Sequence, residues 1–497
     1  MNTVTIHRLA TGVPGLDEVL GGGLPEYSFN LIAGPPGSGK TTLAHQMMFA
    51  MATEARPALY FTVLGEPPLK MLRYQQQYGF FDAAAINHSV RFINLSEHTL
   101  TGDLDRVLER IVEAMKTYAP ALVFVDSFRS VVLSHAVLGS PHNKLQQFVQ
   151  QLGMLMTSWQ ATTFLIGEYF DDIDPNPIFT VADGLIWLRQ SVERNSIVRK
   201  MEIMKMRGQA TLPGLHTFRI SSDGLKVFAP ARRVAAATGG AVAKGVRDAR
   251  LLMGVPRLDE MLGGGLPRGY SLLVAGPSGS GKSILAAAFL AEGVRGGETC
   301  VIACFEQQPD RSRNPSIAKL IANGSVGLVD TRAPDLSIDE TVLLILEEIQ
   351  RLKASRLVID SLSGFELSLA PTFQHDFREK LLRMVTALAA TGITVLMTSE
   401  LEDRYTDLRF SPYGSAFLTD AIIVQRYIEL DSRLRRVMAV VKVRASDHSN
   451  QLCEYSVDAD GIHIGEMLPE QEGLLGGRPT RKRADDPPPA LDSAGEG

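Results

Sequence analysis

The octapeptide GPPGSGKT at residues 34–41 recurs as GPSGSGKS at residues 276–283. Both copies fit the pattern G-x-x-x-x-G-K-[ST], in which glycines without side chains let successive backbone N–H groups turn inward around phosphate oxygens. The lysine brings a positive charge to the β- and γ-phosphates of a nucleotide, and the next hydroxyl is placed to hold Mg²⁺. We call these stretches the first and second P-loop. They predict two nucleotide sites in one chain.

The surroundings of each P-loop support the match, because such a loop follows a buried strand and opens a helix. The apolar run YSFNLIAG (27–34) leads into the first copy, and the helical segment TTLAHQMMFAMATEA (41–55) follows it. The second copy lies between YSLLVAG (270–276) and SILAAAFLAEGV (283–294). A glycine-rich turn that fits by chance is the alternative, and it would not be framed in this way twice. The predicted phosphate-binding residues are Gly34, Gly37, Ser38, Gly39, Lys40, Thr41 and Thr42, with Gly276, Gly279, Ser280, Gly281, Lys282, Ser283 and Ile284.

The composition is that of a soluble globular protein. The chain has 497 residues, of which 45% are hydrophobic and 21% charged, so roughly two or three domains are expected. A formal net charge of −5 implies no overall attraction to nucleic acid or to anionic lipid. Three cysteines cannot form a disulfide framework, and the run TCVIACF around Cys300 and Cys304 favours buried strand residues over metal ligands. No apolar stretch is long enough to span a bilayer and the N-terminus lacks a signal-peptide core, so we expect a cytoplasmic protein.

The two halves of the chain share far more than the P-loop. Residues 11–41 match residues 253–283 without a gap. Further matches pair ALVFVDSF (121–128) with RLVIDSLS (356–363), TVADGLIWLRQ (180–190) with FLTDAIIVQRY (417–427), and EIMKMRG (202–208) with AVVKVRA (439–445). A repeat of this length is a duplicated domain. The predicted organisation is a first domain at 1–228, a linker at 229–249, a second domain at 250–466 and a disordered tail at 467–497.

Strand-like and helical runs alternate within each half. In the first half we predict strands near 27–34, 58–64, 90–95, 121–127 and 162–168, and helices near 41–55, 103–118 and 143–160. This alternation predicts an α/β fold, in which a mainly parallel sheet is covered by helices on both faces. Ligands of such sheets bind at the carboxyl ends of the strands, where both P-loops begin.

A carboxylate ends a buried apolar strand in each half, at Asp126 after LVFV and at Asp360 after RLVI. An acid at this position holds Mg²⁺ in P-loop proteins that hydrolyse nucleotides. An aspartate that only caps the strand is the alternative, and the P-loop upstream favours the metal role. The predicted Mg²⁺ ligands are Thr41, Asp126, Ser283 and Asp360.

Hydrolysis also needs a carboxylate that polarises the attacking water. Glu66 follows the strand ALYFTVL, and Glu306 follows TCVIACF, which places one glutamate in each half at the expected edge of the nucleotide pocket. We predict these two residues as catalytic. Glu168 and Glu400 end the strands TTFLIGE and TVLMTSE. For these two, a sensor role and a structural role remain open.

Cations that could neutralise the charge on a transferred phosphoryl group occur late in each half. They form two K-x-R segments, Lys205 with Arg207 and Lys442 with Arg444. Alternation along a strand places the two cations of a segment on one face and the apolar residue between them toward the core. They lie far in sequence from the P-loop, so they could serve the nucleotide of a neighbouring subunit. A basic, solvated strand face is the alternative.

Together these residues resemble the tandem RecA-type domains of the KaiC-like ATPases, a group related to RadA. The resemblance rests on the paired leaders GLDEVLGGGLP (15–25) and RLDEMLGGGLP (257–267), the two P-loops, the two strands ending in Asp-Ser, and the K-x-R segments. It covers roughly residues 10–228 and 250–465. It implies a homohexameric double ring with ATP and Mg²⁺ between subunits of each ring, and K-x-R residues that bind ATP in trans.

The chain departs from the family pattern at two places. The family has two adjacent glutamates after the second strand of each domain, whereas Glu66 and Glu306 each stand alone. The family also implies autophosphorylation at a Ser-Thr pair before a Thr-Asp element. Here that element is Thr419-Asp420 and the pair's positions hold Ala416 and Phe417, neither of which accepts a phosphate. The hydroxyls of Ser411, Ser415 and Thr419 lie near these positions.

The leading functional hypothesis is a Mg²⁺-dependent ATPase whose two rings act as a signalling switch or timer. An autophosphorylating Ser/Thr kinase that uses a nearby hydroxyl is a second hypothesis, and a nucleotide-locked scaffold with little turnover is another. A DNA-dependent recombination ATPase is opposed by the acidic balance, the absence of a Cys-x₂-Cys zinc ribbon and the lack of a basic, aromatic track. Expected partners are further copies of the chain, and signalling proteins bound through the second ring or the tail. No membrane or nucleic-acid partner is expected.

Overall fold

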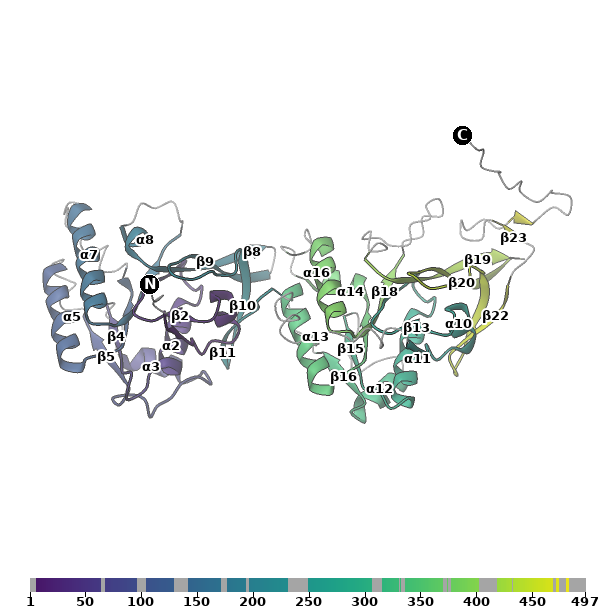
Figure 1. Cartoon of the computed structure of the whole chain (residues 1–497), viewed down its shortest axis with the longest axis horizontal. Helices are drawn as coiled ribbons and strands as arrows, with labels where there is room; N and C mark the ends of the chain where they lie inside the picture. The colour runs from purple at the N-terminus through teal and green to yellow at the C-terminus, as the bar shows by residue number, and fades with distance from the viewer. Residues whose placement is uncertain are drawn as a thin grey trace, which may run out of the picture. The chain divides into compact units, whose positions relative to one another are not determined.

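The computed structural model divides the chain into two compact units, Met1–Pro230 and Ala231–Gly497 (Figure 1). The described residues are 6–63, 68–95, 104–128, 142–170, 177–193, 196–230, 249–305, 315–329, 331, 336–369, 373, 377–401, 418–430, 432–467, 471–472 and 480–481.

The first unit is built on a nine-stranded sheet in the order β11-β10-β9-β8-β3-β7-β6-β4-β5. Strands β8, β3, β7, β6, β4 and β5 run parallel, and β9, β10 and β11 extend the sheet antiparallel from β8. The strands are β3 (Phe29–Gly34), β4 (Ala58–Thr62), β5 (Val90–Asn94), β6 (Leu122–Asp126), β7 (Thr162–Glu168), β8 (Gly184–Glu193), β9 (Ser196–Met206), β10 (Leu215–Ser221) and β11 (Gly224–Val227). A separate small ladder pairs β1 (Arg8–Leu9) with β2 (Leu24–Pro25).

Helices cover both faces of this sheet. They are α1 (Leu16–Leu20), α2 (Lys40–Met51), α3 (Pro68–Gln75), α5 (Leu104–Tyr118), α7 (His142–Ser158) and α8 (Pro177–Val181). Figure 1 shows α5 and α7 on one side of the sheet and α2 with α3 on the other, and each side has its own core of buried side chains. Helix α5 buries Leu104, Val107, Ile111, Ala114 and Met115, the spacing of an amphipathic helix. The predicted α/β fold with a helix-covered, mainly parallel sheet is confirmed.

The second unit repeats this architecture, with the order β16-β15-β17-β18-β14-β19-β20-β21-β22 in its main sheet. Its strands are β12 (Arg250–Leu251), β13 (Leu266–Pro267), β14 (Ser271–Gly276), β15 (Cys300–Cys304), β16 (Val326–Val329), β17 (Arg356–Asp360), β18 (Thr394–Glu400), β19 (Ala421–Leu430), β20 (Arg433–Val443), β21 (Cys453–Val457) and β22 (Ile462–Met467). Its helices are α10 (Pro256–Met261), α11 (Lys282–Arg295), α12 (Pro315–Ala322), α13 (Ile338–Leu352), α14 (Leu362–Ser368) and α16 (Phe377–Ala390). Two short strands, β23 (Gln471–Glu472) and β24 (Thr480–Arg481), pair within the stretch predicted as a tail.

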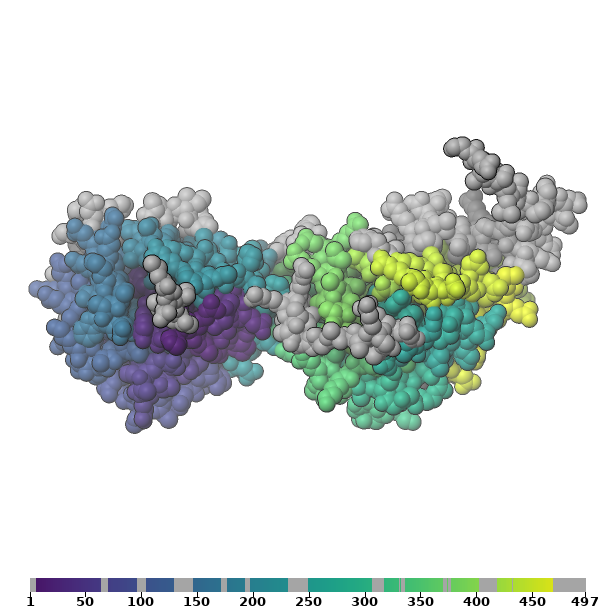
Figure 2. All heavy atoms as spheres, in the orientation of Figure 1, coloured from purple at the N-terminus to yellow at the C-terminus, as the bar shows by residue number. Residues whose placement is uncertain are grey.

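Segments late in each unit contact the leader that precedes its P-loop, which is far away in sequence. In the first unit the Gln209 amide donates to the carbonyl oxygens of Leu20 and Gly23 at 2.7 and 2.8 Å, and the Val227 N–H donates to Pro14. In the second unit β22 packs against α10, and Figure 2 shows these late residues in yellow beside the early ones in teal. These contacts hold the leader before each P-loop in place.

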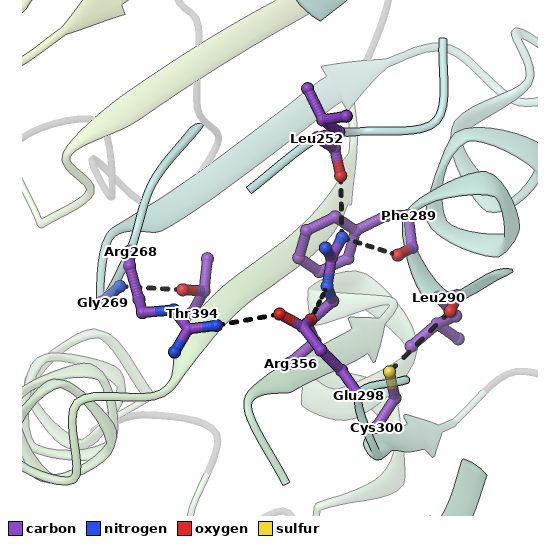
Figure 3. A network of polar contacts seen from close by, with 9 residues as sticks. All are labelled: Leu252, Arg268, Gly269, Phe289, Leu290, Glu298, Cys300, Arg356 and Thr394. Carbon is purple, nitrogen blue, oxygen red and sulfur yellow. Dashed lines mark hydrogen bonds and ion pairs between the residues drawn. The ribbon is translucent and has the colours of Figure 1, made fainter. Parts of the chain in front are cut away.

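A buried ion pair lies at the amino end of β17 in the second sheet (Figure 3). Arg356 is 4% exposed, and its Nε lies 2.5 Å from the Glu298 carboxylate. Its Nη1 donates to the carbonyl oxygens of Leu252 and Phe289 at 2.7 and 3.0 Å. Burial raises the pKa of Glu298, but the hydrogen bond and charge of Arg356 outweigh it and hold the pKa below its ordinary value. The network ties the leader and the P-loop helix α11 to β17.

We predict that Glu298→Gln lowers the stability of the second unit by about 3 kcal/mol, because it leaves a buried guanidinium without its counter-charge. For a unit of this size, that loss corresponds to a fall of roughly 6–12 °C in Tm, measurable by differential scanning calorimetry. Glu379→Gln is the matched control, since its partner Arg383 is 60% exposed in a surface ion pair and such pairs contribute little. Equal Tm values for the two variants would contradict the prediction.

Candidate functional site

The first P-loop connects β3 to α2 at the carboxyl edge of the sheet. Gly39, directly before α2, has φ 101°, and a Cβ at this position would lie 2.6 Å from Ile220 Cδ1. Gly281 takes the same conformation before α11, with φ 105°. Only glycine fits this turn, because other residues rarely adopt a positive φ and Cβ would also clash at Gly39. The turn directs the free N–H groups at the start of each helix into the loop.

A cavity of about 540 Å³ opens at the first P-loop. Its lining combines the P-loop and α2 with residues from distant strands: Gly37, Gly39, Lys40, Thr41, Thr42, Thr62, Met71, Tyr78, Asp126, Ser127, Glu168, Arg199 and Ile220. A volume of this order suits a ligand of nucleotide size. The structure therefore brings Gly37, Gly39, Lys40, Thr41, Thr42 and Asp126, all predicted from sequence, to one cavity.

Lys40 lines this cavity. Its Nζ donates to the Pro35 carbonyl oxygen at 2.8 Å. Burial lowers the pKa of Lys40, and the nearby carboxylates of Glu168 and Asp126 oppose that shift. Lys282 is held similarly in the second P-loop, donating to the carbonyl oxygens of Gly276 and Pro277 at 2.9 and 2.8 Å. Each lysine is thus folded back over its own loop, where it could bind an anion held by the loop.

Asp126 is the acidic counterpart of Lys40. Its Oδ2 accepts hydrogen bonds from the Thr41 hydroxyl at 2.8 Å and from the Tyr60 hydroxyl at 2.7 Å. Burial raises the pKa of Asp126, while these two hydrogen bonds and the charge of Lys40 lower it. The hydroxyl and the carboxylate predicted to hold Mg²⁺ therefore meet directly. Tyr60 was not predicted, because one tyrosine in an apolar strand carries no signal for this role.

The corresponding acid of the second unit, Asp360, has a different partner. Its Oδ1 accepts a hydrogen bond from the Thr398 hydroxyl of β18 at 2.5 Å, and Ile302 takes the place of Tyr60 in the neighbouring strand. Within the described residues, no hydrogen bond joins Ser283 to Asp360. The two acids share a backbone position and differ in the hydroxyl that holds them.

Arg199 lines the first cavity and was not predicted. It lies on β9, and its buried Nε has no hydrogen-bond partner among the described residues. Arg436 holds the matching position on β20, and its Nε is likewise buried without a partner in the described part of the chain. Both arginines stand six residues before the lysine of a K-x-R segment. This recurrence is the signal by which the sequence could have revealed them.

Glu168 also reaches the cavity, where its charge acts on both Lys40 and Asp126. Glu400 is exposed at the same point of β18. Its backbone N–H donates to the Ser363 hydroxyl at 3.2 Å. Glu66, Glu306, Ala416 and Phe417 lie outside the described residues. Thr419, one of the hydroxyls near the expected phosphorylation pair, is fully buried.

The K-x-R segment of the first unit lies near the amino end of β3, whereas the P-loop follows the carboxyl end of this strand. Gly184 at the start of β8 pairs with Asn30 of β3 and with Met206 of β9. About 13 Å of strand separates Asn30 from Gly34, because each strand residue rises about 3.3 Å. Lys205 therefore lies beside the amino end of β3, away from the P-loop of its own domain.

The cations of both segments contact residues at that far edge. Lys205 Nζ donates to the carbonyl oxygen of Thr180 at 3.0 Å, and Arg207 pairs with Asp183 at 3.1 Å. Lys442 Nζ donates to Thr419 at 2.6 Å, and Arg444 pairs with Asp420 at 3.5 Å. Burial and the adjacent arginine lower the pKa of each lysine. An anion bound here would relieve the repulsion between the two cations.

Within the described residues, no group of three or more His, Cys, Asp or Glu is placed to hold a metal ion. In the same part of the chain, no helix is long and apolar enough to cross a membrane.

The fold and the two P-loops define the class of protein, a tandem α/β nucleotide-binding protein with RecA-type domains. The family model described as "ATPase: KaiC" matches residues 9–232 and again residues 251–468. The chain therefore belongs to the KaiC ATPase family.

Similar proteins align over nearly the whole chain. Circadian clock oscillator protein KaiC 1 of Synechocystis is 27% identical, covering 97% of this chain and 93% of that protein. Circadian clock oscillator protein KaiC of Rippkaea orientalis is 27% identical, with 97% and 94% covered. Circadian clock protein KaiC3 of Synechocystis is 26% identical, with 95% of both chains covered. The resemblance found in the sequence is confirmed.

His45 gives the first unit a testable pH dependence. It is fully buried on α2, stacks on Tyr60 with ring centroids 4.5 Å apart, and burial lowers its pKa to about 3. In the unfolded chain its pKa is about 6.5, so the unfolded state binds the extra proton between these values. We predict that the first unit loses up to about 1.4 kcal/mol of stability for each pH unit below about 6.5.

The variant His45→Phe keeps an aromatic ring on Tyr60 and removes the titration. Urea unfolding of both proteins between pH 7.5 and pH 5 should show a shallower loss for the variant. The second unit, which has Ala287 at this position, provides an internal reference for other titrating groups. Parallel pH slopes for wild type and variant would show that His45 does not carry the dependence.

Proposed function

We propose that this protein is a Mg²⁺-dependent ATPase with two nucleotide sites per chain. The observation that carries the proposal is the meeting of Lys40, Thr41 and Asp126 in one cavity of nucleotide size. A buried lysine beside a hydroxyl–carboxylate pair provides a cation for phosphates and oxygen ligands for a hard metal ion. The recurrence of the lysine and the acid in the second unit supports a second site.

The oxygens of Thr41 and Asp126 fit Mg²⁺, because they lie 2.8 Å apart at the cavity wall. Mg²⁺ keeps several waters and needs few protein oxygens when it also contacts phosphates. Thr41 and Asp126 would hold the ion in the first site, and Ser283 and Asp360 would hold it in the second. Bound there, Mg²⁺ would neutralise charge on the β- and γ-phosphates.

The remaining residues would bind the phosphates, orient the water and stabilise charge. The backbone N–H groups of the P-loop and the lysine, Lys40 or Lys282, would bind the phosphate oxygens. Glu66 or Glu306 would orient the attacking water as a general base. Arg199 and Arg436, each in the same unit as its P-loop, would add a further cation. Charge on the γ-phosphoryl group would then be matched by fixed cations, which is the main means of catalysis in phosphoryl transfer.

We further propose that the protein works as a homohexameric double ring. The K-x-R cations lie at the edge of the sheet opposite their own P-loop, so they suit the nucleotide of a neighbouring subunit better than their own. Lys205 and Arg207 would act in the first ring, and Lys442 and Arg444 in the second. The names of the similar clock proteins favour a role as a signalling switch or timer with protein partners. Cytoplasmic location stays a prediction from sequence.

The first experiment follows γ-³²P-labelled ATP with Mg²⁺ on wild type, Glu66→Gln and Glu306→Gln. Loss of the general base should lower phosphate release from the affected ring by about 10²- to 10⁴-fold, because proton transfer contributes about that factor. Protein-bound label is measured in the same samples. Phosphate release without protein label supports an ATPase. Stable label that disappears in Glu306→Gln would favour the autokinase. The absence of both phosphate release and protein label would overturn the enzyme hypothesis.

A mixing experiment tests action in trans. With Lys282→Ala silencing the second ring throughout, we predict that Lys40→Ala and Arg207→Ala chains are each nearly inactive alone. Co-assembled, they should regain measurable ATPase activity, because some interfaces combine an intact P-loop with an intact arginine. The control mixes Lys40→Ala chains with chains that carry both Lys40→Ala and Arg207→Ala. It should stay inactive, because no interface then has an intact P-loop. No recovery in the first mixture would place Arg207 outside the neighbour's site.

A further inference from the structure

The second P-loop is held by two buried side chains from the strands beneath it. The Ser280 hydroxyl donates to Gln425 Oε1 of β19 at 2.9 Å, and the Tyr455 hydroxyl of β21 donates to the Ser280 carbonyl oxygen at 2.6 Å. Gln425 is 0% and Tyr455 4% exposed. Two hydrogen bonds therefore converge on one residue of the loop, the residue before its last glycine.

The first P-loop lacks both of these bonds. Leu188 takes the place of Gln425, since the carbonyl oxygen of each lies beside the first glycine of its P-loop. Phe218 takes the place of Tyr455, since each pairs across its closing hairpin at the same register, Phe218 with Val227 and Tyr455 with Ile464. The Ser38 hydroxyl, which corresponds to that of Ser280, is buried without a partner among the described residues.

The bond from Tyr455 fixes the direction of a phosphate donor. A trans peptide is planar, so its C=O and N–H point in opposite directions. With the Ser280 carbonyl oxygen held toward Tyr455, the N–H of Gly281 in the same peptide must point away from β21. Gly281 precedes Lys282 at the start of α11, where N–H groups bind phosphate. Phe218 has no hydroxyl and cannot fix the matching peptide of the first loop.

Packing alone does not explain Gln425. Its Nε2 is buried without a hydrogen-bond partner in the described part of the chain, and a buried amide with an unpaired N–H₂ destabilises a fold relative to an apolar side chain. Leu188 shows that the same position accepts leucine. Glutamine at position 425 therefore lowers the stability of the fold relative to leucine. Its bond to the P-loop indicates a role other than stability.

We propose that Gln425 and Tyr455 are positioning residues that hold the second P-loop in its phosphate-binding shape before nucleotide arrives, so that the second site binds ATP more tightly than the first. A site that is only partly in its binding shape loses affinity in proportion to the missing fraction. The inference rests on the proposed function, because it requires that both P-loops bind ATP.

The test isolates one site at a time in the full-length chain. Lys40→Ala leaves the second site intact, and Lys282→Ala leaves the first. Binding of a non-hydrolysable ATP analogue with Mg²⁺ is measured by calorimetry. In the Lys40→Ala parent, Tyr455→Phe and Gln425→Leu should each weaken binding by about 5-fold, which equals about 1 kcal/mol, the contribution of an ordinary hydrogen bond. In the Lys282→Ala parent, Leu188→Gln with Phe218→Tyr should tighten binding by a similar factor.

Two further readouts separate positioning from a structural role. Gln425→Leu should keep or raise the Tm of the second unit while it weakens binding, which loss of structure would not do. Hydrogen exchange without nucleotide should become faster at residues 276–285 in Tyr455→Phe. Unchanged affinity in both Tyr455→Phe and Gln425→Leu would overturn this inference and leave the ATPase proposal standing. No binding to either parent would overturn the ATPase proposal itself, and this inference with it.

Discussion

The backbone turn between a buried central strand and the helix that follows it is the constraint on which each unit depends. Strands β3 and β14 are buried along their whole length, and each ends in a loop whose last glycine adopts a positive φ. The glycine has no side chain, and the start of the following helix supplies only the lysine and the hydroxyl. The other functional groups of the site must therefore come from other strands. The acid comes from the end of β6 or β17, and further cations come from β9 or β20. The order of strands around β3 and β14 therefore determines which side chains can reach the site.

The two units use this plan with different side chains. In the first unit Tyr60 donates a hydrogen bond to Asp126 and stacks on His45. The apolar residues Leu188 and Phe218 lie beside the P-loop. In the second unit a threonine holds the acid, and a glutamine and a tyrosine hold the P-loop. The backbone is duplicated while the hydrogen bonds that orient the functional groups are not. A protein with two such sites has the means to give them different affinities and rates, as a switch with two coupled rings would require.

The K-x-R cations lie away from the P-loop of their own unit. Within one unit they lie on the edge of the sheet that faces away from the P-loop, paired with Asp183 or Asp420. Such partly exposed ion pairs contribute little to stability, so stability alone does not explain two adjacent cations at this edge in both units. An assembly in which one subunit's P-loop edge meets the next subunit's K-x-R edge would use them, and it would make each site dependent on two chains.

The sequence by itself determined the duplication, the strands and helices around each P-loop, and the residues of the motifs. These features depend on local pattern: glycine spacing, apolar runs of strand length and a carboxylate at the end of a run. It placed Lys40, Thr41 and Asp126 in one site because strands of a parallel sheet end at one edge. It could not identify Tyr60, Gln425, Tyr455, Arg356 or Glu298, because each is a single residue in an ordinary strand or loop. Their roles come from neighbours far away in sequence, and only the tertiary structure, by fixing which strands lie side by side and which face each side chain occupies, decides those neighbours.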